Sequence, residues 1–270
     1  MKQLLTSLLL LLISGLAQAF DHTHAAWDTL LERHVVLISD GNASQLDYAG
    51  MQADRDALEA YLTSLSAVTE TEYRAWSKPQ RLAFLINAYN AFTVELILTR
   101  YPDIQSIKEL GSLFRSPWKQ RFFNLLGQER HLDELEHELI RAPGAFDEPL
   151  IHFAVNCASV GCPMLRNEAY TAAHLDTQLL DGLQRFLSDH SRNRFDPVSK
   201  RLQVSKIFDW YEEDFEQGHH GFTSLQALFA RYAGLLADTE IDHQRIASGE
   251  YRQEFLDYNW SLNDLDRSER

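Results

Sequence analysis

The loop that contains Cys157 and Cys162 holds the residues of this chain that are best suited to chemistry. Both cysteines of the protein lie in this loop, and Ala158 and Ser159 directly follow the first of them. The preceding residues, 150–156, form an apolar run that predicts a buried strand. A loop at a strand end offers free backbone N–H groups, which can stabilise a thiolate or an oxyanion. We therefore look for function at this loop.

A cysteine nucleophile needs a base, and His137 and His152 are the nearest histidines in the sequence. If residues 150–156 form a strand, alternation places His152 on the face opposite Cys157, so His152 is the poorer partner. His137 precedes the strand on a short predicted helix, and the connecting loop is long enough for helix and strand to lie side by side. A Cys–His pair activates the thiol because the imidazole accepts its proton.

Three other interpretations of the cysteines stay open. Cys157 and Cys162 can form a disulfide, and Cys157 can also be an inert small hydrophobic residue. Zinc is a weaker interpretation, because Cys-x4-Cys is not standard zinc spacing and His152 with both cysteines would still need an unidentified fourth ligand. We expect no metal and no cofactor.

Two polar residues, Asn87 and Asn90, interrupt an otherwise apolar helix that is predicted to run from about Lys78 to Arg100. Ser77 and Gln80 predict a capping box at its start, and the apolar residues around it indicate that the helix passes through the interior. The asparagines are three positions apart and share a face, and buried amides need hydrogen-bond partners. They either bind the backbone of neighbouring loops or line the active cleft.

A second capping box, Asp133 with Glu136, predicts a short helix that ends near Arg141. The capping interaction alone explains Glu136. Residues 205–215 mix aromatic and acidic side chains and predict a helix that docks into the core. In the alternative interpretation, Trp210 or Asp214 forms a wall of the cleft.

Periodicity predicts further helices and two hairpins, with no internal repeat or linker. Helices are expected at residues 23–36, 54–65, 172–188 and 223–235, and hairpins at residues 122–132 and 194–204. The predicted fold class is α+β, with many helices packed around one small, mainly antiparallel sheet. We expect a single globular domain over residues 20–270.

The N-terminus predicts export. Residues 1–19 combine a positive start, an apolar stretch and an Ala17-Gln18-Ala19 cleavage pattern, as in a secretory signal peptide. The mature protein is therefore expected in the periplasm or secreted, with no membrane anchor after cleavage. The net charge of −14, which becomes −15 without Lys2, disfavours nucleic acid as a partner.

Four motifs together resemble the domain-of-unknown-function family 547. They are the runs Arg81–Ala91, Leu132–His137 with Arg141, His152–Pro163, and Ile207–Phe215. The resemblance covers most of the mature chain. It implies a family pattern of Asn-x-Tyr-Asn, Glu-His and a first cysteine, matched by Asn87, Tyr89, Asn90, Glu136, His137 and Cys157. In that pattern Cys162 and His152 are not always kept, which favours a free Cys157 paired with His137.

The functional hypothesis is an exported thiol hydrolase or acyltransferase that acts on an amide or related acyl bond of an unknown small-molecule or peptide substrate. Cys157 would attack, His137 would act as base and then acid, and Asn87 or Asn90 would orient the imidazole or polarise the carbonyl. Amides near Ala158 would hold the oxyanion, with Ser159, Glu136 and Tyr89 nearby. The alternatives are a non-catalytic periplasmic binding or scaffold domain with a Cys157–Cys162 disulfide, or a thiol–disulfide redox protein.

Overall fold

The computed structural model describes residues 19–112 and 115–265. The predicted signal peptide therefore lies outside the described residues except for Ala19. One hydrophobic core runs through the described part of the chain, from Trp27 near its start to Ile246 near its end.

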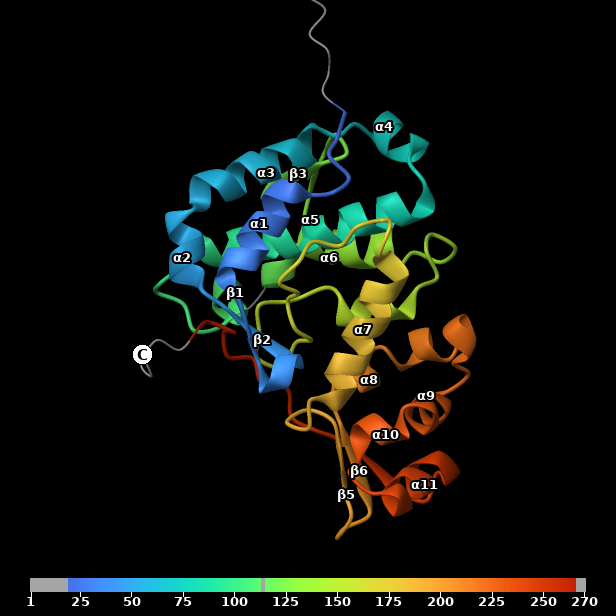
Figure 1. The fold of residues 1–270 in the computed structure, drawn as a ribbon. Helices are drawn as coiled ribbons and strands as arrows, with labels where there is room; N and C mark the ends of the chain where they lie inside the picture. The colour runs from blue at the N-terminus through green and yellow to red at the C-terminus, as the bar shows by residue number, and fades with distance from the viewer. Residues whose placement is uncertain (1–18, 113–114, 266–270) are drawn as a thin grey trace, which may run out of the picture.

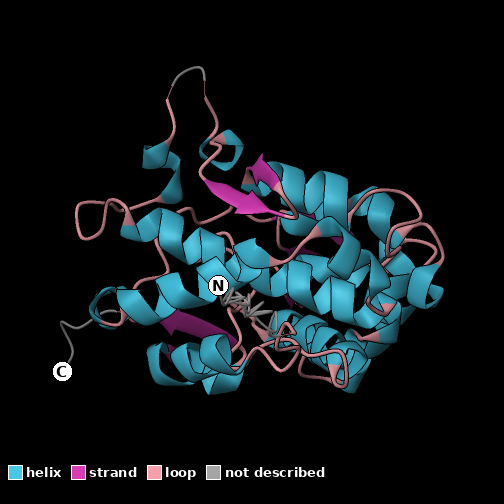
Figure 2. Cartoon of the chain, turned by 90° about the horizontal axis from the view of Figure 1, so that it is seen from above, coloured by secondary structure: helices cyan, strands magenta, loops and turns pink. Residues whose placement is uncertain are grey.

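Helices dominate the described residues, and the strands are short (Figures 1 and 2). The α-helices are α1 (Ala25–His34), α2 (Tyr48–Ala53), α3 (Arg55–Ala67), α4 (Glu70–Ala75), α5 (Lys78–Leu98), α6 (Leu132–Glu134), α7 (Leu175–Ser188), α8 (Ile207–Trp210), α9 (Leu225–Arg231), α10 (Ala233–Leu236) and α11 (Glu240–Ser248). Residues Leu135–Ile140 continue α6 as a π-helix. Short 3₁₀ helices cover Ser39–Gly41, Ile107–Leu110, Pro117–Lys119, Pro149–Phe153, Glu212–Phe215 and His219–Gly221.

The strands form three separate small sheets in the described residues. They are β1 (Val35–Ile38) with β2 (Ala43–Leu46), β3 (Phe123–Leu125) with β4 (Gln128–Arg130), and β5 (Arg194–Asp196) with β6 (Arg201–Val204) and β7 (Arg252–Phe255). All pairs are antiparallel except β6 with β7, which is parallel. The α+β class is confirmed, but the strands form three small sheets instead of one, because the two predicted hairpins, β3–β4 and β5–β6, do not pair with each other.

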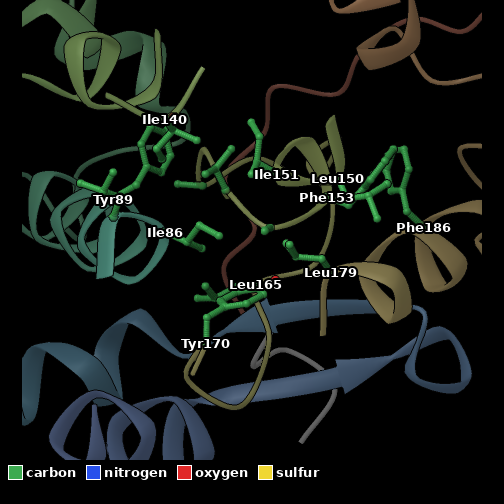
Figure 3. Packing of buried hydrophobic residues seen from close by; sticks show 14 of the residues in the cluster. Ile86, Tyr89, Ile140, Leu150, Ile151, Phe153, Leu165, Tyr170, Leu179 and Phe186 are labelled. Atoms are coloured by element: carbon green, nitrogen blue, oxygen red, sulfur yellow. The ribbon is translucent and has the colours of Figure 1, made fainter. Parts of the chain in front are cut away.

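Helix α5 crosses the middle of the molecule, as the capping box and its apolar composition predict (Figure 1). The Ser77 side chain accepts from the Gln80 amide, and the Gln80 side chain accepts from the Ser77 amide. The helix is long and apolar enough to cross a membrane, but nearly all of it is buried in the protein interior. Figure 3 shows Ile86 and Tyr89 of α5 directed toward the segment that carries Ile151.

The strand predicted over residues 150–156 is wrong. Residues Pro149–Phe153 form a 3₁₀ helix, in which the Glu148 side chain caps the Leu150 amide at 2.9 Å and Pro149 occupies the first turn. The whole run is buried, so its hydrophobic pattern does not alternate and cannot distinguish a strand from a buried helical turn. Glu148 and Pro149 are the helix-start signal that decides between the two.

The capping box predicted at Asp133 is also wrong. His131 is the N-cap, because its Nδ1 accepts from the Glu134 amide at 2.9 Å, and α6 begins at Leu132. Glu136 is therefore free of any capping role. It lies inside the π-helix that follows α6, and π-helical turns are frequent at functional sites.

The other predicted elements are present, some in shortened or broken form. The hairpins at β3–β4 and β5–β6 and the helices α1, α3 and α7 are confirmed. The helix predicted over residues 205–215 breaks at Tyr211 into α8 and a 3₁₀ turn, and the helix over residues 223–235 breaks at Tyr232 into α9 and α10. The break at Tyr211 places this residue and Trp210 at the cavity described next.

Candidate functional site

A cavity of about 320 Å³ opens beside the cysteine loop, and segments from distant parts of the sequence form its lining. The lining contains cysteines, titratable side chains and aromatic side chains. The lining residues are Tyr89, Ser116, Trp118, Asp133, Glu136, His137, His152, Val155, Cys157, Cys162, Pro163, Ile207, Trp210, Tyr211, Tyr258 and Trp260.

The two cysteines are joined in a disulfide that forms part of this lining. Their Cα atoms are 6.3 Å apart. The two sulfur-bearing residues differ in access, since Cys157 is partly exposed whereas Cys162 is only 5 % exposed. Both cysteines line the cavity, and Cys157 is the more exposed of the two.

Asn156 shapes the loop that carries the disulfide. Its side-chain Oδ1 accepts from the Ala158 amide at 2.8 Å, and its Nδ2 donates to the Pro163 carbonyl at 2.7 Å. Ala158 adopts a left-handed conformation with φ of 62°, which the Asn156 hydrogen bond stabilises. The Ala158 amide is thus already bonded inside the loop.

A C-terminal segment, residues 258–265, runs along the outer side of the cysteine loop. The amides of Val160 and Gly161 donate to the carbonyls of Ser261 and Asn259 at 2.9 and 2.8 Å. Glycine at position 161 permits this close approach, because a Cβ there would make tight contacts of 3.0 Å with the Asn259 carbonyl oxygen and with the Tyr258 ring. The same segment reaches back to β2, where the Leu46 amide donates to the Asn263 carbonyl (red trace in Figure 1). The cysteine loop is therefore held from both sides.

Proton donors surround the two sulfur atoms. The Tyr258 hydroxyl donates to Cys162 Sγ at 3.0 Å and lies 3.2 Å from Cys157 Sγ. The Cys157 amide also donates to Cys162 Sγ, at 3.0 Å, whereas the Ser159 hydroxyl lies at 3.5 Å from Cys157 Sγ. Burial raises the pKa of Tyr258 well above its ordinary value, so its hydroxyl keeps its proton at neutral pH. Cys162 Sγ therefore has the shorter contacts with hydrogen-bond donors.

Glu136 projects from the π-helix to the cavity and is buried. Its Oε1 accepts from the Tyr211 hydroxyl at 2.9 Å, and the Tyr89 hydroxyl also bonds to this carboxylate. Burial, together with the neighbouring Glu136 charge, raises the pKa of both tyrosines well above the ordinary value. Both hydroxyls therefore remain donors to the carboxylate.

His137 and His152 belong to a chain of charged groups behind the cavity. Arg141 donates from Nη1 to His137 Nδ1 and from Nε to Asp214 Oδ2, and the latter distance is 2.8 Å. Since a guanidinium only donates, His137 accepts at Nδ1, and the neutral ring then carries its proton on Nε2. His137 Nε2 is 4.0 Å from Asp133 Oδ1. In this arrangement His137 presents an N–H donor to its surroundings.

His152 Nε2 lies 2.7 Å from Asp214 Oδ2, and its ring stacks on Tyr211 with centroids 3.8 Å apart. Burial lowers the pKa of His152, against the opposing effect of the Asp214 hydrogen bond. Burial would raise the pKa of Asp214, but the hydrogen bonds from His152 and Arg141 hold it well below its ordinary value. Asp214 therefore remains ionised and links Arg141 and His152 to the 3₁₀ turn Glu212–Phe215.

The structure gathers only part of the predicted site. Cys157, His137, Glu136 and Tyr89 line one cavity. In the described residues, the side chains within hydrogen-bond distance of the Cys157 sulfur are the hydroxyls of Tyr258 and Ser159 and not an imidazole. Ser159 is buried next to the disulfide. A hydrolytic role for these residues stays a prediction.

Asn87 and Asn90 are not among the lining residues, and both are fully buried. Asn87 exchanges two hydrogen bonds with the backbone of Tyr170, at 2.8 and 3.0 Å. Asn90 donates to the Ala154 carbonyl at 2.9 Å and accepts from the Asn156 amide at 2.8 Å. This geometry matches the structural alternative for the two asparagines, which is to hold loop backbone against α5.

Several lining residues were not among the predicted site residues. His152 was set aside because of the incorrect strand, while Trp210 was considered only as an alternative cleft wall. Trp118, Tyr258 and Trp260 carry no local signal, since nothing in their neighbourhood in the sequence indicates that they meet the cysteine loop. Tyr258 lies 101 positions after Cys157. Only long-range structure reveals such a contact.

Comparison with known proteins bears on the central part of the chain. Residues 73–187 match the family described as "Protein of unknown function, DUF547", which confirms the resemblance noted from the motifs over this range. No curated protein and no solved structure matches the chain significantly. Residues 73–187 of this chain therefore form a DUF547 family segment, which contributes the disulfide, His137 and Glu136 to the cavity.

Proposed function

We propose that the Cys157–Cys162 disulfide exchanges with the thiols of a small-molecule or peptide substrate that enters the cavity. The observation that carries this proposal is the asymmetry of the disulfide, in which Cys157 is partly exposed to the cavity and Cys162 is buried beneath two proton donors. This is the thiol–disulfide alternative among the functions considered from the sequence.

The exchange has two steps. A substrate thiolate attacks Cys157 Sγ, the S–S bond breaks, and Cys162 leaves as a thiolate. A second substrate thiolate then attacks the substrate sulfur of the mixed disulfide and releases Cys157 as a thiolate. The substrate dithiol is thereby oxidised to a disulfide by two electrons, and the protein disulfide is reduced to two thiols. A disulfide substrate reverses both steps.

The surroundings favour Cys162 as the leaving group. The Tyr258 hydroxyl and the Cys157 amide, both 3.0 Å from Cys162 Sγ, would donate charge-assisted hydrogen bonds to the new thiolate. A better stabilised leaving thiolate speeds exchange and raises the reduction potential. The bond also closes a short loop, so it contributes little to stability through chain entropy and can open without unfolding the protein.

The hydrolase or acyltransferase hypothesis is the second candidate, because Cys157 and His137 line the same cavity. It requires reduction of the disulfide before Cys157 can attack an acyl bond. The His137 tautomer in this arrangement supports donation from Nε2, as to a carbonyl oxygen or a leaving group, more than it supports a base. Export to the periplasm or the exterior, where disulfides persist, stays part of both proposals.

Matched serine variants separate the candidates. Folded, oxidised protein is exposed to excess glutathione, quenched with acid and analysed by mass spectrometry. Exchange predicts that reduced glutathione takes the wild-type protein through a mixed disulfide to the dithiol. It also predicts that the free Cys157 of Cys162→Ser exchanges with oxidised glutathione, keeps one glutathione as a mixed disulfide and releases the other as a thiol. In Cys157→Ser, the buried Cys162 should react slowly. A bond that stays closed in the folded protein, or faster labelling of Cys162 than of Cys157, contradicts the proposal.

The same variants test the second candidate. Cys162→Ser leaves Cys157 as a free thiol, so a hydrolase should cleave an activated acyl ester in this variant and lose the activity when His137→Ala is added. Exchange needs both cysteines, whereas hydrolysis needs only Cys157. Ester turnover by Cys162→Ser that depends on His137 would therefore favour the hydrolase.

A further inference from the structure

Four aromatic rings form one wall of the cavity next to the disulfide. We call Trp118, Trp210, Tyr258 and Trp260 the aromatic wall. Tyr258 and Trp260 have ring centroids 4.5 Å apart, and Trp210 lies 4.9 Å from Tyr258 and 5.8 Å from Trp260. Trp118 meets Trp260 edge-on at 5.8 Å. The rings are packed on one another, yet Trp210 remains 44 % exposed.

Such a wall favours a cation over other ligands. The face of an indole ring is electronegative, and tryptophan is the best aromatic partner for an ammonium group. The chain already uses one ring of the wall in this way, because Lys108 Nζ lies 3.8 Å from the centroid of Trp260. The unoccupied aromatic surface at Trp210 offers the same chemistry to a ligand.

Two carboxylates of the cavity lining supply negative charge. Glu136 and Asp133 both line the cavity, while the described lining includes no lysine or arginine. The hydrogen-bond partners of Glu136 are the neutral hydroxyls of Tyr211 and Tyr89, and it makes no ion pair within 4 Å in the described residues, although the Arg141 charge acts on it from farther away. Asp133 lies 3.7 Å from Lys119 Nζ and 4.0 Å from His137 Nε2. A buried carboxylate that makes no direct ion pair would be stabilised by a cationic ligand in the cavity.

We propose that the cavity binds the alkylammonium group of an organic cation between the aromatic wall and Glu136. This deepens the proposed exchange function, because it assigns the substrate a positive charge next to its reacting sulfur. An aminothiol, or a cysteine flanked by lysine in a peptide, has this chemistry. Anionic thiols, glutathione among them, should react with the disulfide more slowly than a cationic aminothiol, because the two carboxylates repel them.

Binding is tested on oxidised protein, so the result does not depend on whether exchange occurs. The probes are choline and its neutral isostere 3,3-dimethylbutan-1-ol, and the readout is tryptophan fluorescence. We expect choline to bind with a Kd lower by about tenfold, as one desolvated cation–π contact with a nearby carboxylate supplies. N-acetyl-lysine amide and N-acetyl-norleucine amide form a second pair, which distinguishes a primary ammonium from a methylated one.

Glu136→Gln tests the carboxylate without removing a fluorophore or the acceptor for the tyrosine hydroxyls. It should reduce the preference for the cation by about fivefold or more, since the ring contacts persist but the charge is lost. Glu138→Gln is the matched control, because Glu138 is exposed on the same π-helix and does not line the cavity. It should leave the preference unchanged.

Equal affinity for cation and neutral isostere in both probe pairs would overturn this inference, as would no detectable binding of either cation. A loss of preference in Glu138→Gln equal to that in Glu136→Gln would also overturn it, because the effect would then reflect only the net charge. If the cations bind as expected but the disulfide does not exchange, the proposed function fails and the cation site stands.

Discussion

The two sides of the cavity come from different parts of the chain and are held in different ways. The family segment, residues 73–187, contributes the disulfide, His137 and Glu136 and rests on the buried helix α5. The C-terminal side contributes Trp210, Tyr258 and Trp260. Its last part, residues 258–265, is held largely by backbone hydrogen bonds to the cysteine loop and to β2.

This difference suggests that the two sides of the cavity have different roles. The reactive groups belong to the family segment, whereas most of the aromatic contacts for a ligand lie beyond it. Tyr258 is the exception on the C-terminal side, because its hydroxyl contacts both sulfur atoms. Substitutions on each side should therefore change different properties, namely the stability of the fold or the reduction potential of the disulfide.

The largest effect is expected from Asn90→Ala on the family side. The substitution removes the partners of the Ala154 carbonyl and the Asn156 amide, which would both be left buried and unbonded. We expect a loss of about 3 kcal/mol in the free energy of unfolding, measured by urea denaturation. Asn124→Ala, at an exposed position of β3, should change it by less than about 0.5 kcal/mol. A small loss in Asn90→Ala, with thiol reactivity abolished, would instead indicate a catalytic role.

The next largest effect is expected from Asp214→Asn, which breaks the ionic link between the two sides. Arg141 and the buried His152 would lose their shared anion, at a cost of about 2 kcal/mol at neutral pH. Because the pKa of Asp214 is lowered by folding, the folded state binds fewer protons than the unfolded state below the ordinary pKa.

The stabilisation by Asp214 is therefore complete above a pH of about 4 and is lost as the pH falls toward its folded pKa. Urea denaturation of both proteins between neutral and acid pH measures this. The gap between wild type and Asp214→Asn should narrow only below that pH. A gap that is the same at every pH would mean that the Asp214 charge does not stabilise the fold.

A smaller effect is expected from Tyr258→Phe, which removes the donor that the C-terminal side gives to Cys162 Sγ. Losing about 1.5 kcal/mol of thiolate stabilisation lowers the reduction potential by about 30 mV. Redox titration followed by thiol alkylation measures the shift. Tyr251→Phe is the control, because Tyr251 packs against the core beside β7. The reduction potential of the disulfide in this variant should match that of the wild type. An unchanged reduction potential in Tyr258→Phe would show that the Tyr258 hydroxyl does not stabilise the Cys162 thiolate.

The smallest effect is expected from Ser159→Ala on the family side. Its hydroxyl is 3.5 Å from Cys157 Sγ and 3.4 Å from the Cys157 carbonyl, both long for hydrogen bonds. We expect less than about 0.5 kcal/mol in stability and no measurable shift in potential under the same titration. A shift as large as that of Tyr258→Phe would show that the two hydroxyls act together on the disulfide.

Local signals in the sequence predicted the fold where the interactions themselves are local. The capping box at Ser77 and Gln80 is present, and so is the turn at Gly127 in the β3–β4 hairpin. The strand predicted over residues 150–156 was wrong because a fully buried run has no periodicity to read. The helix start at His131 was missed because its imidazole, an uncommon capping group, takes the role assigned to Asp133.

Prediction of the site was likewise limited to features with local signals in the sequence. Cys157 and His137 line the same cavity, but the predicted pairing of their side chains stays a prediction. The C-terminal side could not be predicted, because residues 258–265 reach the cysteine loop through backbone hydrogen bonds, which any sequence can form. On the cysteine-loop side, the small residue at position 161 is the sequence feature that matches this close approach.

The proposed thiol–disulfide exchange requires that the Cys157–Cys162 disulfide opens while the protein stays folded. The most direct measurement is the redox equilibrium of Cys157 and Cys162 in glutathione buffers, read by acid quench, alkylation and mass spectrometry, with circular dichroism as a monitor of folding. We predict a reversible transition at a reduction potential above roughly −300 mV, because structural disulfides that resist reduction by glutathione have potentials below this value. A bond that remains closed until the protein unfolds would contradict the central claim.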